Sequence, residues 1–178
     1  MKYKLLLLFI LTTMSLGMRA QISVQAIPNI VINSIFDLPP FERAICCIKY
    51  YEGMHRKKDY PYVGYGHQIR AGEKYSSDMS LNEADALLRK DLKEYCSIFR
   101  NYGKDSLLLA VLAYNVGPYR ILGCKGKHPR PKSNLLKKIE FGIRDFKEEY
   151  IQFCHWKGKK IPSIEQRRMV ELLLLYVQ

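Results

Sequence analysis

The chain has 178 residues, of which 29 are basic and 17 acidic, so its formal net charge is +12. This length is enough for one domain with a substantial core. The chain contains no internal repeat, no low-complexity segment and no second apolar stretch that suggests a membrane span. Repeat architectures and membrane proteins with several spans are therefore excluded.

The first 20 residues have the order of a secretory signal peptide. Lys2 and Lys4 form a short positive start, residues 5–16 are apolar, and a small residue precedes a possible cleavage site. The apolar run is shorter than the roughly 20 residues that span a bilayer. An uncleaved membrane anchor is the alternative, because Arg19 lies inside the cleavage region. We therefore expect a protein exported to the periplasm or the extracellular space.

Without these 20 residues the chain keeps 26 basic and 17 acidic residues, a net charge of +9. A basic surface suits polyanionic partners. Cell-wall polymers and anionic membranes fit an exported protein better than nucleic acid, and the basic residues form no recognisable nucleic-acid-reading motif. A soluble basic protein without such a partner is the plainer alternative.

Five cysteines are present, so at least one thiol must stay free even in an oxidising compartment. Cys46 and Cys47 are expected to be buried free thiols, because they lie in an apolar helical pattern. The cysteine spacing fits no standard zinc pattern. No metal ion and no organic cofactor are expected.

After residues 1–20, three segments follow one another: an extended lead-in, a helix and a small β-hairpin. Residues 21–38 show no regular period and are predicted to be an extended lead-in. The proline pair 39–40 then predicts a helix start, apolar residues at helical spacing lead to Glu52, and Gly53 is placed to end the helix. Residues 54–75 hold aromatic and β-branched residues broken by glycine, which predicts a small irregular β-hairpin.

The rest of the chain is predicted to be helical. Helices are expected over residues 80–99, 106–116, 133–153 (as one or two helices) and 163–176, with loops at 125–132 and 157–162. Ser80 with Glu83 and Ser163 with Gln166 have the spacing of capping boxes. The fold class is therefore α+β and mostly helical, with one small β element near the N-terminal end.

Glu52 is the strongest candidate for a catalytic residue. It lies on a helix stripe that otherwise carries core residues, so partial burial should raise its carboxyl pKa. The negative end of the helix dipole acts in the same direction. A carboxyl group that stays protonated near neutral pH is what a glycosidase uses to protonate the leaving oxygen. A solvated glutamate at a frayed helix end is the alternative.

The sequence that follows Glu52 resembles the phage-type lysozyme family, glycoside hydrolase family 24. Four stretches appear in that family's order and together cover roughly residues 40–175. They are Glu52-Gly53 followed by residues 63–67 (VGYGH), residues 112–117 (LAYNVG), residues 133–138 (SNLLKK), and Trp156 with Ile161-Pro162, residues 166–168 (QRR) and Glu171.

This resemblance implies a lysozyme-like domain over residues 39–178, with a small β lobe, a larger helical lobe and a substrate cleft between them. It also implies cleavage of the β-1,4 bond between N-acetylmuramic acid and N-acetylglucosamine in peptidoglycan. The family's acid, a glutamate followed by glycine at a helix end, corresponds to Glu52.

The interval between Glu52 and His67 departs from the family pattern. It is several residues shorter than in the best-known members, and Tyr62 stands where the family has a threonine. Asp59 is the only carboxylate in the interval and is the candidate base that activates water. Otherwise Asp59 is a turn residue or a surface partner of a neighbouring lysine. Without a base, Glu52 would act alone in a lytic transglycosylase, or the protein would only bind the wall.

Four residues are candidates for substrate binding: Tyr62, Tyr65, His67 and Asn115. The tyrosines, together with Tyr60, would either stack on sugar rings or pack the small lobe. His67 would serve as a structural hydrogen-bonding residue or as a proton shuttle. Asn115 would hydrogen-bond an acetamido group, or would simply be the end of a helix.

A further expectation concerns two adjacent arginines near the end of the chain. One of Arg167 and Arg168 is expected to reach Glu52, with surface charges as the alternative.

The expected partner is peptidoglycan, and an exported wall-cutting enzyme suits local wall opening for a secretion or conjugation machine. We expect a monomer that meets membrane only through an uncleaved signal segment.

Overall fold

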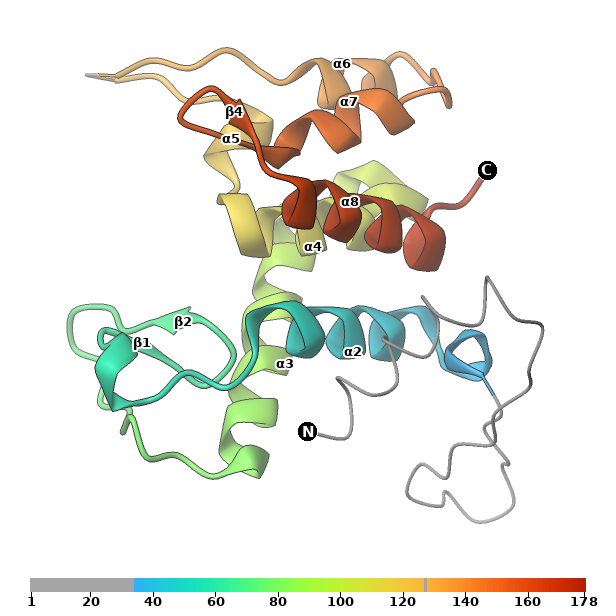
Figure 1. The fold of residues 1–178 in the computed structure, drawn as a ribbon. Coiled ribbons are helices and arrows are strands. Elements are labelled where there is room, and N and C mark those ends of the chain that lie inside the picture. The colour runs from blue at the N-terminus through green and yellow to red at the C-terminus, as the bar shows by residue number, and fades with distance from the viewer. Residues whose placement is uncertain (1–33, 127) are drawn as a thin grey trace.

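The computed structural model describes residues 34–126 and 128–178, which form a small β lobe and a larger helical lobe (Figure 1). The helices are α2 (Pro40–Glu52), α3 (Leu81–Ile98), α4 (Ser106–Val116), α5 (Tyr119–Leu122), α6 (Asn134–Glu140), α7 (Lys147–Ile151) and α8 (Pro162–Leu175). Short 3-10 helices are η1 (Ile35–Asp37), η2 (Lys57–Asp59), η3 (Arg100–Asp105) and η4 (Gln152–Cys154), and the strands are β1 (Tyr62–Val63), β2 (His67–Gln68), β3 (His155–Trp156) and β4 (Lys159–Lys160). The predicted signal peptide and residues 21–33 of the lead-in lie outside the described residues.

The small lobe follows α2 and contains the predicted hairpin. Strands β1 and β2 are antiparallel, with Val63 opposite His67. Gly53 ends α2 with a φ of 65°, a backbone conformation that favours glycine, and it directs the chain into the hairpin. The position of Glu52 at the end of α2 therefore places it where the two lobes meet.

Helix α4 lies at the centre of the larger lobe and has the predicted bounds. Its residues are apolar on all sides, which is the pattern of a buried helix, and Leu108 to Ala113 are all buried. Helix α3 rises from the small lobe and packs on α4, while α2 packs on α8 (Figure 1). The mostly helical α+β fold with two lobes, expected from the resemblance, is confirmed.

The five cysteines are all free, and the expected burial of Cys46 and Cys47 is confirmed. Burial raises the pKa of the Cys46 thiol to about 11 and raises that of Cys47 further. Buried thiols that stay protonated are unreactive. These two residues therefore serve as small apolar groups in the core.

The end of the lead-in contains a turn, which corrects the prediction of an extended backbone for residues 35–37. Ile35–Asp37 form a 3-10 turn because Ser34 and Asp37 cap it reciprocally. The Asp37 carboxylate accepts a hydrogen bond from the Ser34 backbone N–H at 2.9 Å, and the Ser34 hydroxyl accepts one from Phe36 N–H at 3.3 Å. Such local side-chain bonds fold a short segment without any hydrophobic period.

The predicted loop at residues 157–162 and the second capping box are also wrong. Lys157 and Gly158 have φ values of 48° and 78° and form a tight turn between β3 and β4. Two successive positive φ values match the twist of a hairpin. Helix α8 then begins at Pro162 with Ile161 as its cap, so the Ser163 side chain does not cap it. Proline in the first turn starts this helix.

Helices α2 and α3 are joined by ion pairs. Arg89 of α3 donates two hydrogen bonds to the Glu42 carboxylate, at 2.6 and 2.8 Å, and Asp85 binds Lys49 of α2. These contacts fix the direction of α2, whose last residue is Glu52.

We expect the pair formed by Glu42 and Arg89 to contribute stability that depends on pH. The hydrogen bonds from Arg89 hold the pKa of Glu42 below its ordinary value of 4.5. Because this pKa is lower in the folded state, the contribution is present above about pH 4.5 and is lost as pH falls through the folded value. Urea unfolding between about pH 7 and pH 3 should show a shallower acid decline for Glu42→Gln than for wild type. Equal slopes, with the exposed-site variant Asp78→Asn as control, would contradict this expectation.

Candidate active site

A groove of about 590 Å³ lies between the two lobes. One wall comes from the hairpin of the small lobe and the other from α3 and the C-terminal end of α4. Its lining residues are Tyr62, Gly66, His67, Gln68, Ile69, Arg70, Asp91, Tyr95, Tyr114, Asn115, Val116 and Gly117. The cleft expected from the resemblance is therefore present.

The Glu52 carboxyl group lies beside this groove, with its two oxygens in different surroundings. Oε1 accepts a hydrogen bond from Arg167 Nη1 at 2.7 Å. Oε2 lies 3.7 Å from the position that a Cβ atom on Gly66 would occupy. The side chain is 20% exposed, so it is partly buried as predicted. One oxygen is thus bound by the helical lobe, and the other lies near Gly66 in the turn between β1 and β2.

Arg167 belongs to a buried network that runs behind Glu52. Its Nε donates to Glu171 Oε1 at 2.9 Å, and Glu171 is 0% exposed. Arg168 lies 3.1 Å from the second Glu171 oxygen, and the Tyr150 hydroxyl donates to that oxygen at 2.8 Å. The prediction that one of the two arginines reaches Glu52 is confirmed for Arg167. Both arginines are buried, so the alternative of two surface charges is wrong.

Asn115 is connected to the same network. Its Oδ1 accepts a hydrogen bond from Arg168 Nη2 at 2.9 Å, while the residue itself is exposed and lines the groove. The bond fixes the amide plane with its oxygen turned towards Arg168. The amide N–H groups of Asn115 are then the atoms suited to donate to a ligand.

The two candidate tyrosines lie in different environments. Tyr62 is 42% exposed and lines the groove, so it stays a candidate for stacking on a sugar. Tyr65 is 8% exposed and belongs to the hydrophobic core, with Lys49 Nζ 5.3 Å from its ring centroid. Its position supports the packing alternative. Tyr60 is 69% exposed but is not among the residues that line the groove.

His67 has a structural position, which argues against its use for substrate binding. Nδ1 lies 2.8 Å from Asp91 Oδ2 and Nε2 lies 2.8 Å from Glu73 Oε2, and the side chain is 4% exposed. Both ring nitrogens are therefore engaged with carboxylates. His67 joins the hairpin to α3 through Asp91, in agreement with the structural alternative.

Asp59 lies next to His55. This histidine belongs to no recognised sequence motif. The Asp59 Oδ2 atom accepts a hydrogen bond from the Arg56 backbone N–H at 2.8 Å and lies 3.9 Å from His55 Nδ1. His55 Nε2 in turn lies 3.7 Å from the position that a Cβ atom on Gly66 would take, the same distance as Glu52 Oε2. Glu52 and His55 thus both approach Gly66, and Asp59 lies beside the other ring nitrogen of His55.

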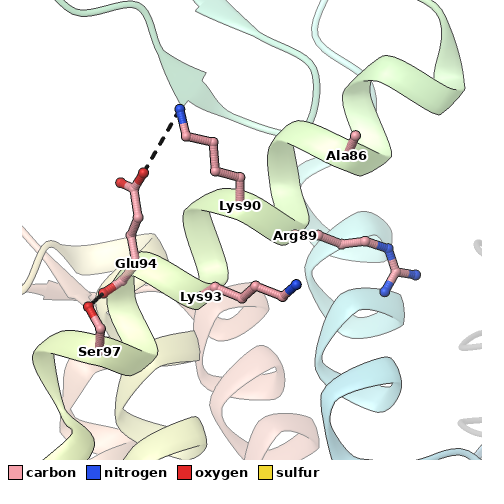
Figure 2. Close-up of a pocket in the computed structure, with 6 residues that line it drawn as sticks. All are labelled: Ala86, Arg89, Lys90, Lys93, Glu94 and Ser97. Atoms are coloured by element: carbon pink, nitrogen blue, oxygen red, sulfur yellow. Dashed lines mark hydrogen bonds and ion pairs between the residues drawn. The ribbon is translucent and has the colours of Figure 1, made fainter.

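A second pocket lies on the outer face of α3 (Figure 2). It is lined by Ala86, Arg89, Lys90, Lys93, Glu94 and Ser97, none of which lines the groove. Lys90 forms an ion pair with Glu94, and Arg89 is held by Glu42. The described residues contain no group of three His, Cys, Asp or Glu side chains that could hold a metal ion.

Gly66 has a backbone that another residue would adopt only under strain, with a φ of 102°. A methyl group there would lie in the gap between Glu52 and His55. We expect Gly66→Ala to lower the turnover that the resemblance implies by roughly 10- to 100-fold, as small displacements at a reacting centre do. The strained φ should also reduce the free energy of unfolding by about 1–3 kcal/mol.

Gly72→Ala is a matched control for this variant. Gly72 lies in the same lobe at a φ of 88°, and a Cβ atom added there would have no atom within 4 Å. Its stability loss should be similar, but the activity per folded molecule should be unchanged. Turnover on sacculi and urea unfolding measured for both variants would separate the two effects. Equal activity of the two variants would contradict a role for the Gly66 gap.

A two-lobed α+β fold with a glutamate at a helix end beside the interlobe groove defines a lysozyme-type enzyme. A model of the phage lysozyme family matches residues 49–171, more than half of the chain, and the chain therefore belongs to this family. The family consists of glycoside hydrolases, so the protein is a peptidoglycan hydrolase of the lysozyme type. No curated protein matches the chain.

Proposed function

We propose that the protein is a muramidase that cleaves the β-1,4 bond between N-acetylmuramic acid and N-acetylglucosamine, with Glu52 as the acid. The observation that carries this proposal is the asymmetry of the Glu52 carboxyl group. Arg167 holds Oε1, while Oε2 faces Gly66 at the edge of the groove. In a glycan chain bound along the groove, this oxygen would deliver the proton to the leaving glycosidic oxygen.

The groove offers further contacts that suit an amino-sugar polymer. Tyr62 presents an exposed ring on one wall, and sugar rings stack on such surfaces. On the opposite wall Asn115 has amide N–H groups that suit an acetamido carbonyl oxygen. Without residues 1–20 the chain has 26 basic and 17 acidic residues, and this net charge of +9 favours a negatively charged cell-wall polymer.

Muropeptide analysis tests this function. The protein without residues 1–20 is incubated with purified sacculi, and the released fragments are separated and identified. Reducing-end products are expected and indicate hydrolysis. Anhydro products would instead identify a lytic transglycosylase that uses the same glutamate. Binding to sacculi without release of any fragments would identify a wall-binding protein and would rule out the proposed catalysis.

We also propose that the enzyme is exported and opens the wall locally for a secretion or conjugation machine, acting as a monomer. The signal-peptide pattern of residues 1–20 supports export, and peptidoglycan lies outside the cytoplasm. Among residues 34–126 and 128–178, no helix is both long and apolar enough to cross a membrane. A strain carrying Glu52→Gln should lose transfer or assembly while it stays viable. Unchanged transfer would argue against this role.

A further inference from the structure

A histidine and a glutamate both lie close to Gly66. Glu52 Oε2 and His55 Nε2 each lie 3.7 Å from the point where a Cβ atom on Gly66 would stand, so the two atoms are no further apart than twice that distance. Inverting glycosidases keep their acid and base roughly 6.5–9.5 Å apart, which leaves room for a water molecule and the sugar. Twice 3.7 Å is 7.4 Å, so the largest separation that these two distances allow lies inside this range.

The local structure holds His55 in a defined orientation. Its backbone N–H donates to the Gly64 carbonyl oxygen at 2.7 Å, which ties it to the hairpin. Its Nδ1 is buried and has no hydrogen-bond partner among the described residues, but lies 3.9 Å from Asp59 Oδ2. Nε2 is therefore the nitrogen on the side of Gly66, and Nδ1 is the nitrogen on the side of the carboxylate.

Asp59 is suited to support a charge on His55 rather than to act on water itself. Its Oδ2 is fixed by the Arg56 backbone N–H at 2.8 Å, and the same oxygen is the one that faces His55. A carboxylate at this distance stabilises an imidazolium ion electrostatically. The ring of Tyr62, which lines the groove, lies 6.0 Å from the His55 ring, centroid to centroid.

We propose that His55 is the general base of this enzyme and that Asp59 is its positioning residue. The inference rests on the proposed muramidase function, because a base is needed only if water attacks. It gives a role to the short polar interval after Glu52, which holds both His55 and Asp59.

The proposed step balances as a hydrolysis. A water oxygen attacks the anomeric carbon of N-acetylmuramic acid, and one water proton moves to His55 Nε2. The bond between that carbon and the glycosidic oxygen breaks, and the leaving oxygen takes the proton of Glu52. The imidazolium ion, stabilised by Asp59, then returns its proton through solvent to the Glu52 carboxylate. Attack on the face opposite the leaving group inverts the anomeric configuration.

Chemical rescue with azide tests the base directly. We expect His55→Ala to lower kcat on sacculi by about 10²-fold or more, with KM changed much less. Azide carries no proton to remove, so it should restore cleavage in His55→Ala and yield the α-glycosyl azide, identified by NMR. Glu52→Gln should not be rescued, because its leaving oxygen still lacks a proton. Asp59→Asn should lose less activity than His55→Ala.

The controls separate this inference from the proposed function. His128→Ala, at an exposed site, should keep wild-type activity, and His55→Gln provides a bulkier variant if His55→Ala does not fold. If the wild type releases no fragments, the proposed function itself fails. If the wild type is active but His55→Ala and His55→Gln match it, only the base assignment fails. Anhydro products from the wild type, or a lost activity that azide does not restore, would also overturn the base assignment.

Discussion

Glu52→Gln is expected to lower the release of muropeptides from sacculi by roughly 10²- to 10⁴-fold, the usual contribution of a general acid. Glutamine keeps the size of the side chain, and its amide oxygen can still accept a hydrogen bond from Arg167. The ion pair at 2.7 Å loses its charge, but Arg167 keeps Glu171 as a partner. The free energy of unfolding should therefore change by no more than about 2 kcal/mol.

The same substitution at a glutamate away from the groove is the matched control. Glu148 is exposed on α7 and is not one of the residues that line the groove. Glu148→Gln should leave turnover and urea unfolding at the wild-type level. Turnover of Glu52→Gln within a few-fold of wild type, measured on the same sacculi, would refute the assignment of Glu52 as the acid.

The parts of this site that the sequence could predict are those set by neighbouring residues. The proline pair and Gly53 mark the ends of α2, and the helical spacing between them places Glu52 at its last turn. The glycine-broken aromatic run gives the hairpin, and the apolar run gives α4 with its observed bounds. Each of these signals lies within about ten to fifteen residues of chain, where period and turn chemistry apply.

The partners of the site residues depend on contacts between distant segments. Arg167 lies 115 positions after Glu52, so no local pattern could show which of two adjacent arginines reaches it. His67 binds Asp91 across the interface with α3, and this contact determines its structural role.

His55 could not be found from the sequence because it has no motif of its own. It stands three residues after Glu52 in a polar stretch that is typical of a loop. Only the fold of the hairpin brings its ring to Gly66, with the carboxylate of Asp59 behind it. The carboxylate predicted from the sequence is thus near the site, but the histidine lies between it and Gly66.

Arg167→Met is expected to have the largest effect on stability of any single change at the site. The arginine is buried and donates to both Glu52 and Glu171. Methionine fills most of its volume but leaves these two carboxylates with one cation fewer. Breaking a buried ion pair on one side costs about 3–5 kcal/mol. We expect about 3 kcal/mol, since Arg168 and Tyr150 still bind Glu171.

Urea unfolding of Arg167→Met, Glu52→Gln and the double variant measures whether this loss belongs to the ion pair that joins α8 to α2. If the two residues stabilise the fold through each other, the double variant should lose at least about 0.5 kcal/mol less than the sum of the single variants. Arg120→Met, at an exposed site of α5, controls for the loss of a positive charge and should change stability by less than about 0.5 kcal/mol. Additive losses, or a loss in Arg167→Met no larger than that of Arg120→Met, would mean that the buried pair does not hold Glu52 in place. A coupled loss would instead make Arg167 the link through which α8 fixes the catalytic carboxyl group at the end of α2.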